Sequence, residues 1–374
     1  MTLIFRWLFV AIAILLAAPL AAAEPLDPKS GKEDGELIWY DIRALGIEGQ
    51  GWTEVKSPFD RLPAKAEGKV RDAVWSLSRD SAGMCVRFST DSPAVHCRWT
   101  LTKANLAMPH MAATGVSGVD LYVNTAKGWR WVACGRPTAQ TNSAALVAGL
   151  PAESRDWLLY LPLYNGVSSV EIGVAKSAKV SPLPREKGKD KPLVFYGTSI
   201  THGACASRPG MVHTAILGRK LDRPVINLGF SGNGKMENEV NELLAEIDAE
   251  IYVIDCLPNM TAVEVAQRTE PLVALIRKAR PTTPIVLVED RTYSDAHLVN
   301  SKRERNDTSR AALKAAYDKL IAAGDKHLYY IPGEHLLGDD DEGTVDSSHP
   351  TDLGFMRQAE AMLPVLAPPL KPAQ

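Results

Sequence analysis

The sequence predicts an all-β sandwich of jelly-roll-like character, followed by an α/β domain whose parallel sheet lies between two layers of helices. Short β-rich runs separated by turn residues fill residues 35–180. After them, continuous apolar runs alternate with helical patterns, as expected for strands that are covered on both faces. The length of 374 residues is enough for two such domains.

The β-rich runs of the first half are expected to form antiparallel strands. They are AVWSLS (73–78), MCVRFS (84–89), VHCRWTLT (95–102), GVDLYVN (118–124), GWRWVACG (128–135), DWLLYLPLY (156–164) and VSSVEIGVA (167–175). A stretch rich in proline, glycine and charge follows at residues 181–192 and lacks apolar periodicity. We interpret this stretch as the linker to the second domain, residues 193–368.

The second half predicts a three-layer α/β/α domain with a parallel sheet. Its expected strands are LVFYG (193–197), VINLGF (225–230), IYVIDCL (251–257), PIVLVED (284–290) and LYYIPG (328–333). Its helical signals are the spacing of Val240, Leu243, Leu244 and Ile247, a Thr261-x-x-Glu264 capping box, and amphipathic stretches at 303–323 and 352–364. Ligands of such sheets bind beyond the carboxyl ends of the strands, so chemistry is expected there.

Charge and motif content exclude several classes of partner. Forty-two Lys and Arg residues balance 44 Asp and Glu residues, which gives no electrostatic reason to expect nucleic acid or an anionic membrane. Neither G-x-x-x-x-G-K-[ST] nor G-x-G-x-x-G occurs, and the histidines lack H-E-x-x-H spacing. The acidic run 339–342 does not match an EF-hand and is expected to be a solvated loop. We therefore expect no cofactor and no metal.

The N-terminus has the pattern of a signal peptide. Arg6 precedes an apolar run over 7–20 and the small residues 21–23, so cleavage is expected after Ala23. A retained anchor is the alternative, but the run is shorter than the roughly 20 residues of a spanning helix. The mature protein is then periplasmic or secreted, with no membrane attachment.

Export would place five cysteines in an oxidising compartment. The alternation of residues around Cys85 and Cys97 predicts that their side chains point apart. We expect buried thiols in preference to a disulfide.

Four polar blocks follow strand ends or precede the last helix. They contain Ser199 after the first expected strand, Gly232 after the second, Asn259 after the third, and Asp346 with His349 near the C-terminus. Each block alone is an ordinary cap or turn. Their order and their placement at one sheet edge indicate an active site.

These blocks resemble those of the SGNH hydrolases, also called the GDSL family, over most of residues 191–368. The resemblance implies a flavodoxin-like parallel sheet. Thr198 stands where that family has an acid, and Met260 follows the asparagine of the third block. Upstream, Gly118-Val119-Asp120-Leu121-Tyr122 resembles the GxDLY element of a β-sandwich domain that precedes some of these enzymes.

The resemblance implies a serine hydrolase in which Ser199 is the nucleophile, His349 the general base and Asp346 its orienting acid. A serine hydroxyl needs such a base, because it is a poor nucleophile until an imidazole accepts its proton. The backbone N–H groups of Ser199 and Gly232 and the side-chain amide of Asn259 are then the oxyanion hole.

Other residues are candidates for substrate contact, each with a structural alternative. His202 follows the serine block, Asn233 and Lys235 follow Gly232, and Asp290 and Arg291 stand at the end of the fourth expected strand, at the same rim of the sheet. Aromatic rings of the β-domain are suited to stacking on sugars or to core packing, namely Trp129, Trp131, Trp157, Tyr160 and Tyr164.

The sequence thus predicts a secreted serine esterase that hydrolyses small acyl esters by an acyl-enzyme mechanism. The expected substrate is an acylated small molecule or polysaccharide, with O-acetyl groups on carbohydrate preferred because no long apolar lid interrupts the α/β domain. A lipase, acylhydrolase or thioesterase of the GDSL type is one alternative. A non-catalytic exported glycan-binding protein is the other.

Overall fold

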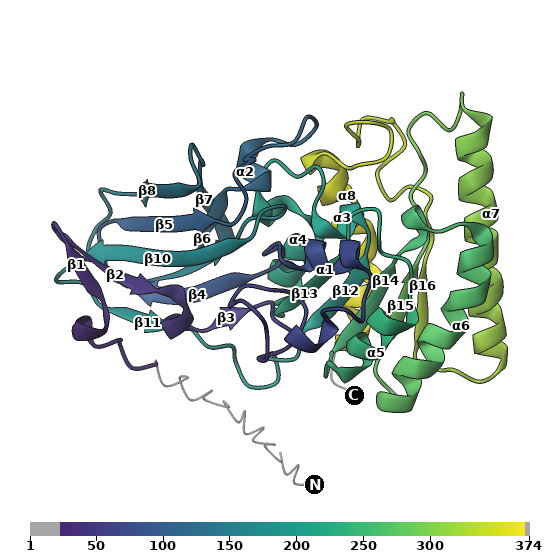
Figure 1. Cartoon of the computed structure of the whole chain (residues 1–374), viewed down its shortest axis with the longest axis horizontal. Coiled ribbons are helices and arrows are strands. Elements are labelled where there is room, and N and C mark those ends of the chain that lie inside the picture. The colour runs from purple at the N-terminus through teal and green to yellow at the C-terminus, as the bar shows by residue number, and fades with distance from the viewer. Residues whose placement is uncertain (1–22, 371–374) are drawn as a thin grey trace, which may run out of the picture.

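The computed structural model describes residues 23–370 and shows a β-sandwich packed against an α/β domain (Figure 1). The expected signal peptide lies outside the described residues, apart from Ala23. Within residues 23–370, no helix is both long and apolar enough to cross a membrane.

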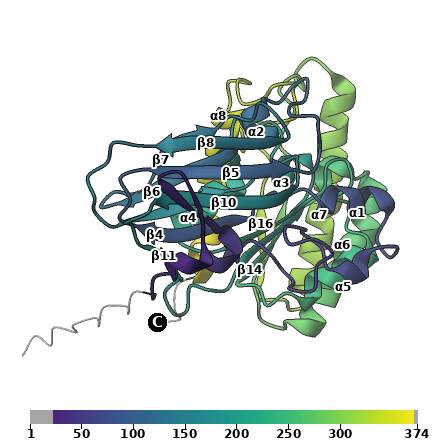
Figure 2. The same ribbon diagram turned by 60° about the vertical axis from the view of Figure 1, so that its left-hand side comes forward.

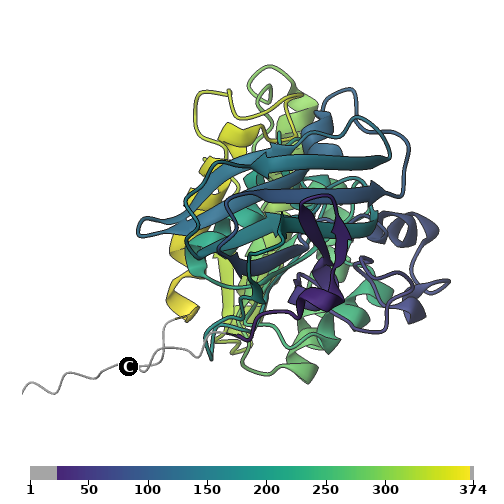
Figure 3. The same ribbon diagram turned by 90° about the vertical axis from the view of Figure 1, so that its left-hand side faces the viewer.

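The sandwich consists of two antiparallel sheets with an apolar core between them, and its first sheet faces the viewer in Figure 3. That sheet has the order β1 (Lys32–Asp34), β2 (Leu37–Asp41), β10 (Val167–Ala175), β5 (Val95–Leu101), β8 (Thr141–Val147). The second has the order β11 (Val180–Pro182), β4 (Cys85–Thr90), β9 (Arg155–Tyr160), β6 (Val119–Thr125), β7 (Gly128–Gly135), with β3 (Ile47–Glu48) beside β4.

Residue alternation on these strands decides which side chains enter the core. On β5, buried residues alternate with partly exposed ones, and Cys97 lies in the sandwich core. Cys85 belongs to the other sheet and faces the α/β domain, where it packs near Ala215. All five cysteines are free, as expected from this opposite orientation.

One expected strand is wrong: residues 73–78 belong to the helix α1 (Asp72–Ser78). Val74 and Ser78 lie one helical turn apart and are both buried, so the buried positions of this run have the spacing of a helix. Val74 packs with Leu62, Ala66 and Val70 against the core of the α/β domain. The segment therefore covers the second domain and pairs with no strand of the sandwich.

The α/β domain has a five-stranded parallel sheet in the flavodoxin-like order 2-1-3-4-5, which confirms the predicted fold. The strands in this order are β13 (Val225–Gly229), β12 (Leu193–Gly197), β14 (Ile251–Asp255), β15 (Ile285–Val288) and β16 (Leu328–Ile331). Ser199 follows β12, so it lies where the strand order reverses between β12 and β14, which is the ligand-binding position of such sheets.

Helices cover both faces of this sheet, as Figures 1 and 2 show. Two helices, α4 (His213–Leu221) and α8 (Asp352–Leu366), pack on one face. Three others, α5 (Asn238–Glu246), α6 (Ala262–Ala279) and α7 (Asn300–Ala322), cover the opposite face. The predicted capping box is present at the start of α6, where Thr261 and Glu264 bond reciprocally.

The GxDLY element joins the two domains close to the nucleophile. Buried Asp120 accepts hydrogen bonds from the backbone N–H of Gly210 at 2.8 Å and from the Arg208 guanidinium at 2.7 Å. Arg208 also donates to the hydroxyl of Tyr122 at 2.5 Å. The motif of the sandwich thus holds the segment that follows the short helix α3 (Ser199–His202). One further sandwich helix, α2 (Ala113–Val116), packs against the same segment.

Candidate active site

Ser199 lies at the tight turn between β12 and α3. Thr198 is the N-cap of α3, and its hydroxyl accepts the N–H of Ile200 at 3.3 Å. The threonine that stands in place of an acid therefore caps the helix. Ser199 is the first residue of the helix and is buried except for 6% of its surface.

Asp346 and His349 lie on one compact loop. A bridge between Thr344 and Pro350 closes this loop, and the Asp346 Oδ1 atom accepts the backbone N–H groups of Ser348 at 3.1 Å and His349 at 2.8 Å. These bonds fix the carboxylate at the centre of the turn. The two residues between the acid and the histidine are thus what the turn requires.

The three side chains form a hydrogen-bonded chain. Ser199 Oγ lies 2.9 Å from His349 Nε2, although the two residues are 150 positions apart in the sequence. His349 Nδ1 lies 2.7 Å from Asp346 Oδ2. The carboxylate fixes the proton on Nδ1, which leaves the lone pair of Nε2 directed at the serine hydroxyl.

Asp346 is ionised in this arrangement. Partial burial raises the pKa of its carboxyl, but the hydrogen bonds from the His349 backbone and ring outweigh burial and lower the pKa below its usual value. A negative charge therefore remains beside the imidazole, where it stabilises the imidazolium that forms during general-base catalysis.

The loop after β13 carries Gly232, one of the expected oxyanion donors, and lies against the turn that holds Ser199. Gly232 has a φ of 69°, a left-handed conformation that favours glycine. A side chain at Gly234 would collide with the carbonyl oxygen of Gly197, so only glycine allows this loop to lie against the nucleophile turn. Gly234 N–H donates to Asn259 Oδ1 at 3.2 Å, which leaves the NH2 group of that amide free for another acceptor.

Two arginines from the N-terminal half hold this loop, and sequence reasoning missed both. Buried Arg61 donates to the carbonyl oxygens of Asn227 at 3.1 Å and Gly229 at 2.7 Å, at the end of β13. Arg71 donates to the side-chain oxygen of Asn233 at 2.6 Å, directly after Gly232. Their role depends on contacts between distant segments, which leave no local signal in the sequence.

Comparisons with known proteins agree with this geometry. A family model described as the GDSL-like lipase/acylhydrolase family matches residues 190–367, and one described as the N-terminus of SGNH-hydrolase-type esterases matches residues 37–180. A crystal structure of a GDSL-like lipase from Bacteroides ovatus is 35% identical, with a TM-score of 0.84, over 89% of this chain and 98% of that one. The chain belongs to the GDSL-like lipase/acylhydrolase family. It is accordingly an esterase-type hydrolase.

More distant structures share the fold of this GDSL hydrolase. A salicylyl-acyltransferase from a tetracycline biosynthetic pathway is 18% identical, with a TM-score of 0.70, over 91% of this chain and 98% of that one. An acetyl xylan esterase from the rumen bacterium Butyrivibrio proteoclasticus is 12% identical, with a TM-score of 0.54, over 88% and 98%. A search of curated proteins finds no match.

His202 of the hydrolase is an internal residue, which corrects its expected role in substrate contact. Its side chain has no exposed surface, its ring stacks on Tyr164 at 4.0 Å, and its Nε2 atom lies 2.7 Å from the Leu163 carbonyl oxygen. Burial and the nearby Arg61 guanidinium lower the pKa of His202, so the ring is neutral. It supports the nucleophile turn from beneath.

Asp290 and Arg291 are also buried, which corrects their expected place on the substrate rim. The Arg291 guanidinium lies 3.5 Å from an oxygen of Asp255 and 3.3 Å from an oxygen of Asp290. Burial raises the pKa of Asp255 to about 7, against the attraction of Arg291. These three side chains are buried below the carboxyl edge of the sheet. The sequence shows that a residue follows a strand, but it does not show whether the side chain is exposed at the edge or buried below it.

Asn233 and Lys235 are partly exposed and lie on the loop after β13, which we call the oxyanion loop. The Asn233 side chain accepts from Arg71 and donates to the Ser231 carbonyl oxygen at 2.7 Å, and the Lys235 carbonyl oxygen accepts from Arg268 at 2.9 Å. Both residues stabilise the loop. Contact with substrate remains a prediction for each.

Most of the candidate sugar-binding rings are occupied by packing. Trp157 lies in the sandwich core, Tyr160 packs at the domain interface, and Tyr164 donates to the Ser199 carbonyl oxygen at 3.0 Å. Trp129 packs against the same interface. Trp131 is 51% exposed, but its indole donates to Asp120 at 2.8 Å.

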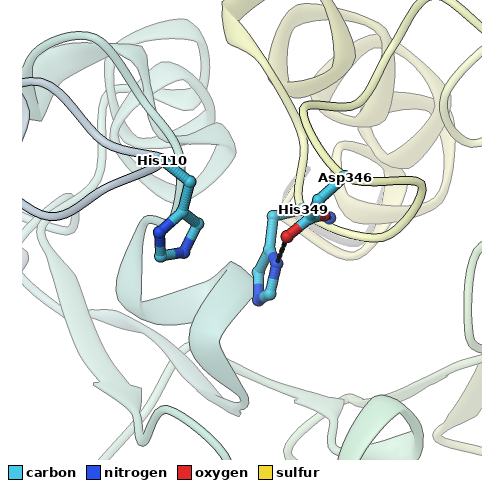
Figure 4. A group of neighbouring side chains, drawn as sticks. All are labelled: His110, Asp346 and His349. Carbon is cyan, nitrogen blue, oxygen red and sulfur yellow. Dashed lines mark hydrogen bonds and ion pairs between the residues drawn. The ribbon is translucent and has the colours of Figure 1, made fainter.

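The sandwich contributes the exposed residue His110 next to His349. His110 lies on the loop between β5 and α2, and its ring centroid is 5.6 Å from that of His349 (Figure 4). The sequence offers no signal for this placement, because His110 lies in a loop of the other domain.

Proposed function

We propose that the protein is a serine esterase that removes acetyl or similarly small acyl groups from hydroxyl-rich carbohydrate. The observation that carries this proposal is the continuous contact from Ser199 Oγ to His349 Nε2 at 2.9 Å and from His349 Nδ1 to Asp346 at 2.7 Å. This arrangement is the one that acyl transfer through a serine requires.

In the proposed mechanism, Ser199 Oγ attacks the ester carbonyl carbon while His349 Nε2 takes the hydroxyl proton. The carbonyl oxygen becomes an oxyanion, which the N–H groups of Ser199 and Gly232 and the Asn259 amide stabilise. His349 then gives its proton to the departing alcohol oxygen, and an acyl-serine remains. Water, deprotonated by His349, releases the carboxylic acid and restores the hydroxyl.

The surroundings of the triad support a polar alcohol as the second half of the substrate. A hollow of about 320 Å³ borders the loop of Asp346 and has a mixed lining, with polar side chains such as Thr292, Ser294 and Asp341 beside the apolar Leu336 and Leu337. The Ser294 backbone N–H donates to the Ser347 carbonyl oxygen at 3.0 Å, so hollow and loop are adjacent. The polar side chains of this hollow offer hydrogen-bond partners to sugar hydroxyls.

The likeness of fold to carbohydrate esterases also supports this choice. A family two carbohydrate esterase from Clostridium thermocellum is 14% identical, with a TM-score of 0.57, over 76% of this chain and 91% of that one. We further propose that the protein acts after export, because residues 1–23 have the pattern of a signal peptide. Cell fractionation and N-terminal sequencing test this, with Glu24 as the expected first residue.

Acetate release tests the proposed function. Wild-type protein and Ser199→Ala are incubated with acetylated xylan, other acetylated glycans, and p-nitrophenyl acetate and decanoate. We expect turnover of acetyl esters by the wild type and none above background by the variant. Preference for decanoate would indicate a lipase or acylhydrolase. Retention on a glycan column without any turnover would indicate a binding protein.

A further inference from the structure

We propose that His110, Asp346 and His349 form a binding site for a divalent transition metal of the Zn²⁺ class, and that metal bound there inhibits the esterase. One ligand atom from each residue lies within 4.8 Å of the others. Figure 4 shows the two imidazoles side by side and the Asp346 carboxylate bonded to His349, with His110 supplied by the sandwich and the other two residues by the α/β domain.

The donor set is the one such metals prefer. Two imidazole nitrogens and one carboxylate oxygen match a zinc site with three protein ligands and an open fourth position. Ligand atoms about 2.0–2.2 Å from the metal lie roughly 3.3 Å apart in a tetrahedral site, so atoms that are now up to 4.8 Å apart have to approach by up to about 1.5 Å. His110 is exposed, so its ring is free to turn toward the pair. Hard cations such as Ca²⁺ favour all-oxygen sites and are excluded by this chemistry.

The backbone around His110 holds it in place. Met108 and Met111 exchange two backbone hydrogen bonds of 3.0 and 3.1 Å across Pro109 and His110, which closes a two-residue turn. Met111 is buried against the core of the α/β domain. His110 is thus presented at the tip of a turn that is anchored to the catalytic domain, near His349.

Inhibition follows from the chemistry of imidazole. A neutral imidazole has one nitrogen lone pair, and His349 needs that lone pair to accept the serine proton. A metal that binds Nε2 takes it directly and displaces Ser199. A metal that binds Nδ1 forces the ring proton onto Nε2, which then cannot act as a base. Either mode removes general-base catalysis, and coordination of Asp346 also removes its contact with the ring.

Direct binding tests the site without reference to turnover. Isothermal titration of chelator-treated protein with ZnCl2 is carried out on Ser199→Ala, alone and combined with His110→Ala or His110→Asn. We expect one zinc per chain for Ser199→Ala. We expect affinity to fall by about tenfold or more in both double variants, because even outer-shell partners of a metal are worth about 10–100-fold. His335→Ala is the matched control, since His335 is an exposed histidine paired with a carboxylate outside the site.

Inhibition is measured with p-nitrophenyl acetate, and each variant is compared with its own rate in EDTA. This arm rests on the proposed esterase function. We expect zinc, but not calcium, to inhibit the wild type reversibly, and His110→Ala to raise the half-inhibiting concentration by about tenfold or more. Equal binding by the His110 variants, no binding at millimolar zinc, or stimulation by zinc would overturn the proposal. An inactive wild type that still binds zinc through His110 would refute the esterase function and retain the metal site.

Discussion

At the scale of single residues, general-base catalysis by His349 depends on the proton held between Asp346 and His349. Asp346 Oδ2 lies 2.7 Å from the ring and its other oxygen accepts two backbone N–H groups. The carboxylate thus fixes both its own loop and the tautomer of the histidine.

Replacing Asp346 by Asn should lower kcat for p-nitrophenyl acetate by a factor on the order of 10²–10⁴, because an amide NH2 facing Nδ1 favours the wrong tautomer. Asp340→Asn is the control, since Asp340 pairs with Arg357 away from the triad. Retention of more than half of the wild-type kcat in Asp346→Asn would show that the carboxylate does not orient the base.

Buried Asp255 predicts a pH-dependent stability. Burial raises its pKa to about 7 in the folded state, whereas the unfolded value is about 3.9. At a pH between these two pKa values only the folded state holds the Asp255 proton. The contribution of Asp255 to stability is therefore fully present below the unfolded pKa and is lost as pH rises toward 7. The difference in Tm between Asp255→Asn and wild type should therefore be more positive at pH 8 than at pH 5. No change with pH would show that Asp255 is ionised throughout.

At the scale of elements, the oxyanion loop depends on side chains from the other half of the chain. Arg71 donates to the Asn233 side chain at 2.6 Å and to Glu237 at 2.6 Å, and so bridges the loop to the start of α5. Arg61 fixes the end of β13 from which the loop leaves. These arginines are positioning residues, because they act on the donors through the backbone.

Loss of Arg71 should therefore impair the transition state more than substrate binding. We expect Arg71→Ala to lower kcat about tenfold with little change in KM, less than the roughly 10²–10³ of a lost donor, since the loop stays attached elsewhere. Arg43→Ala is the matched control, an arginine paired with Asp41 on the sandwich. A change in KM alone would assign Arg71 to substrate binding.

The elements that the sequence predicted correctly have strong local signals. The five parallel strands are continuous apolar runs, and α6 begins at a capping box that involves only Thr261 and Glu264. The triad was predictable because Ser199, Asp346 and His349 stand in blocks that follow the order of those in the SGNH hydrolases. Sequence reasoning predicted a strand where α1 lies and missed Arg61, Arg71 and His110 at the site. Tertiary contacts decide the conformation of α1 and the places of these side chains, and such contacts leave no periodic pattern in the sequence.

At the scale of the whole molecule, apolar packing and hydrogen bonds join the two halves of the chain. Leu62, Ala66, Val70 and Val74 from the N-terminal half pack into the core of the α/β domain. The sandwich also holds the segment after the nucleophile through Asp120 and Tyr122. Each buried apolar side chain contributes about 1.5–3 kcal/mol, which is large against a total stability of about 5–15 kcal/mol.

A fragment of residues 181–370 should therefore not fold by itself. We expect it to be insoluble or to lack cooperative unfolding, while the intact chain unfolds in one transition by circular dichroism and calorimetry. An isolated fragment that unfolds cooperatively and hydrolyses p-nitrophenyl acetate would show that the sandwich is dispensable for the catalytic fold.

Covalent labelling shows whether Ser199 is a nucleophile that His349 activates. Intact protein is treated with a fluorophosphonate, which reacts with activated serines, and the adduct is located by peptide mass spectrometry. We expect a single adduct on Ser199 that is lost in Ser199→Ala and forms far more slowly in His349→Ala. An unlabelled Ser199 in folded wild-type protein, or equally fast labelling without His349, would contradict this expectation.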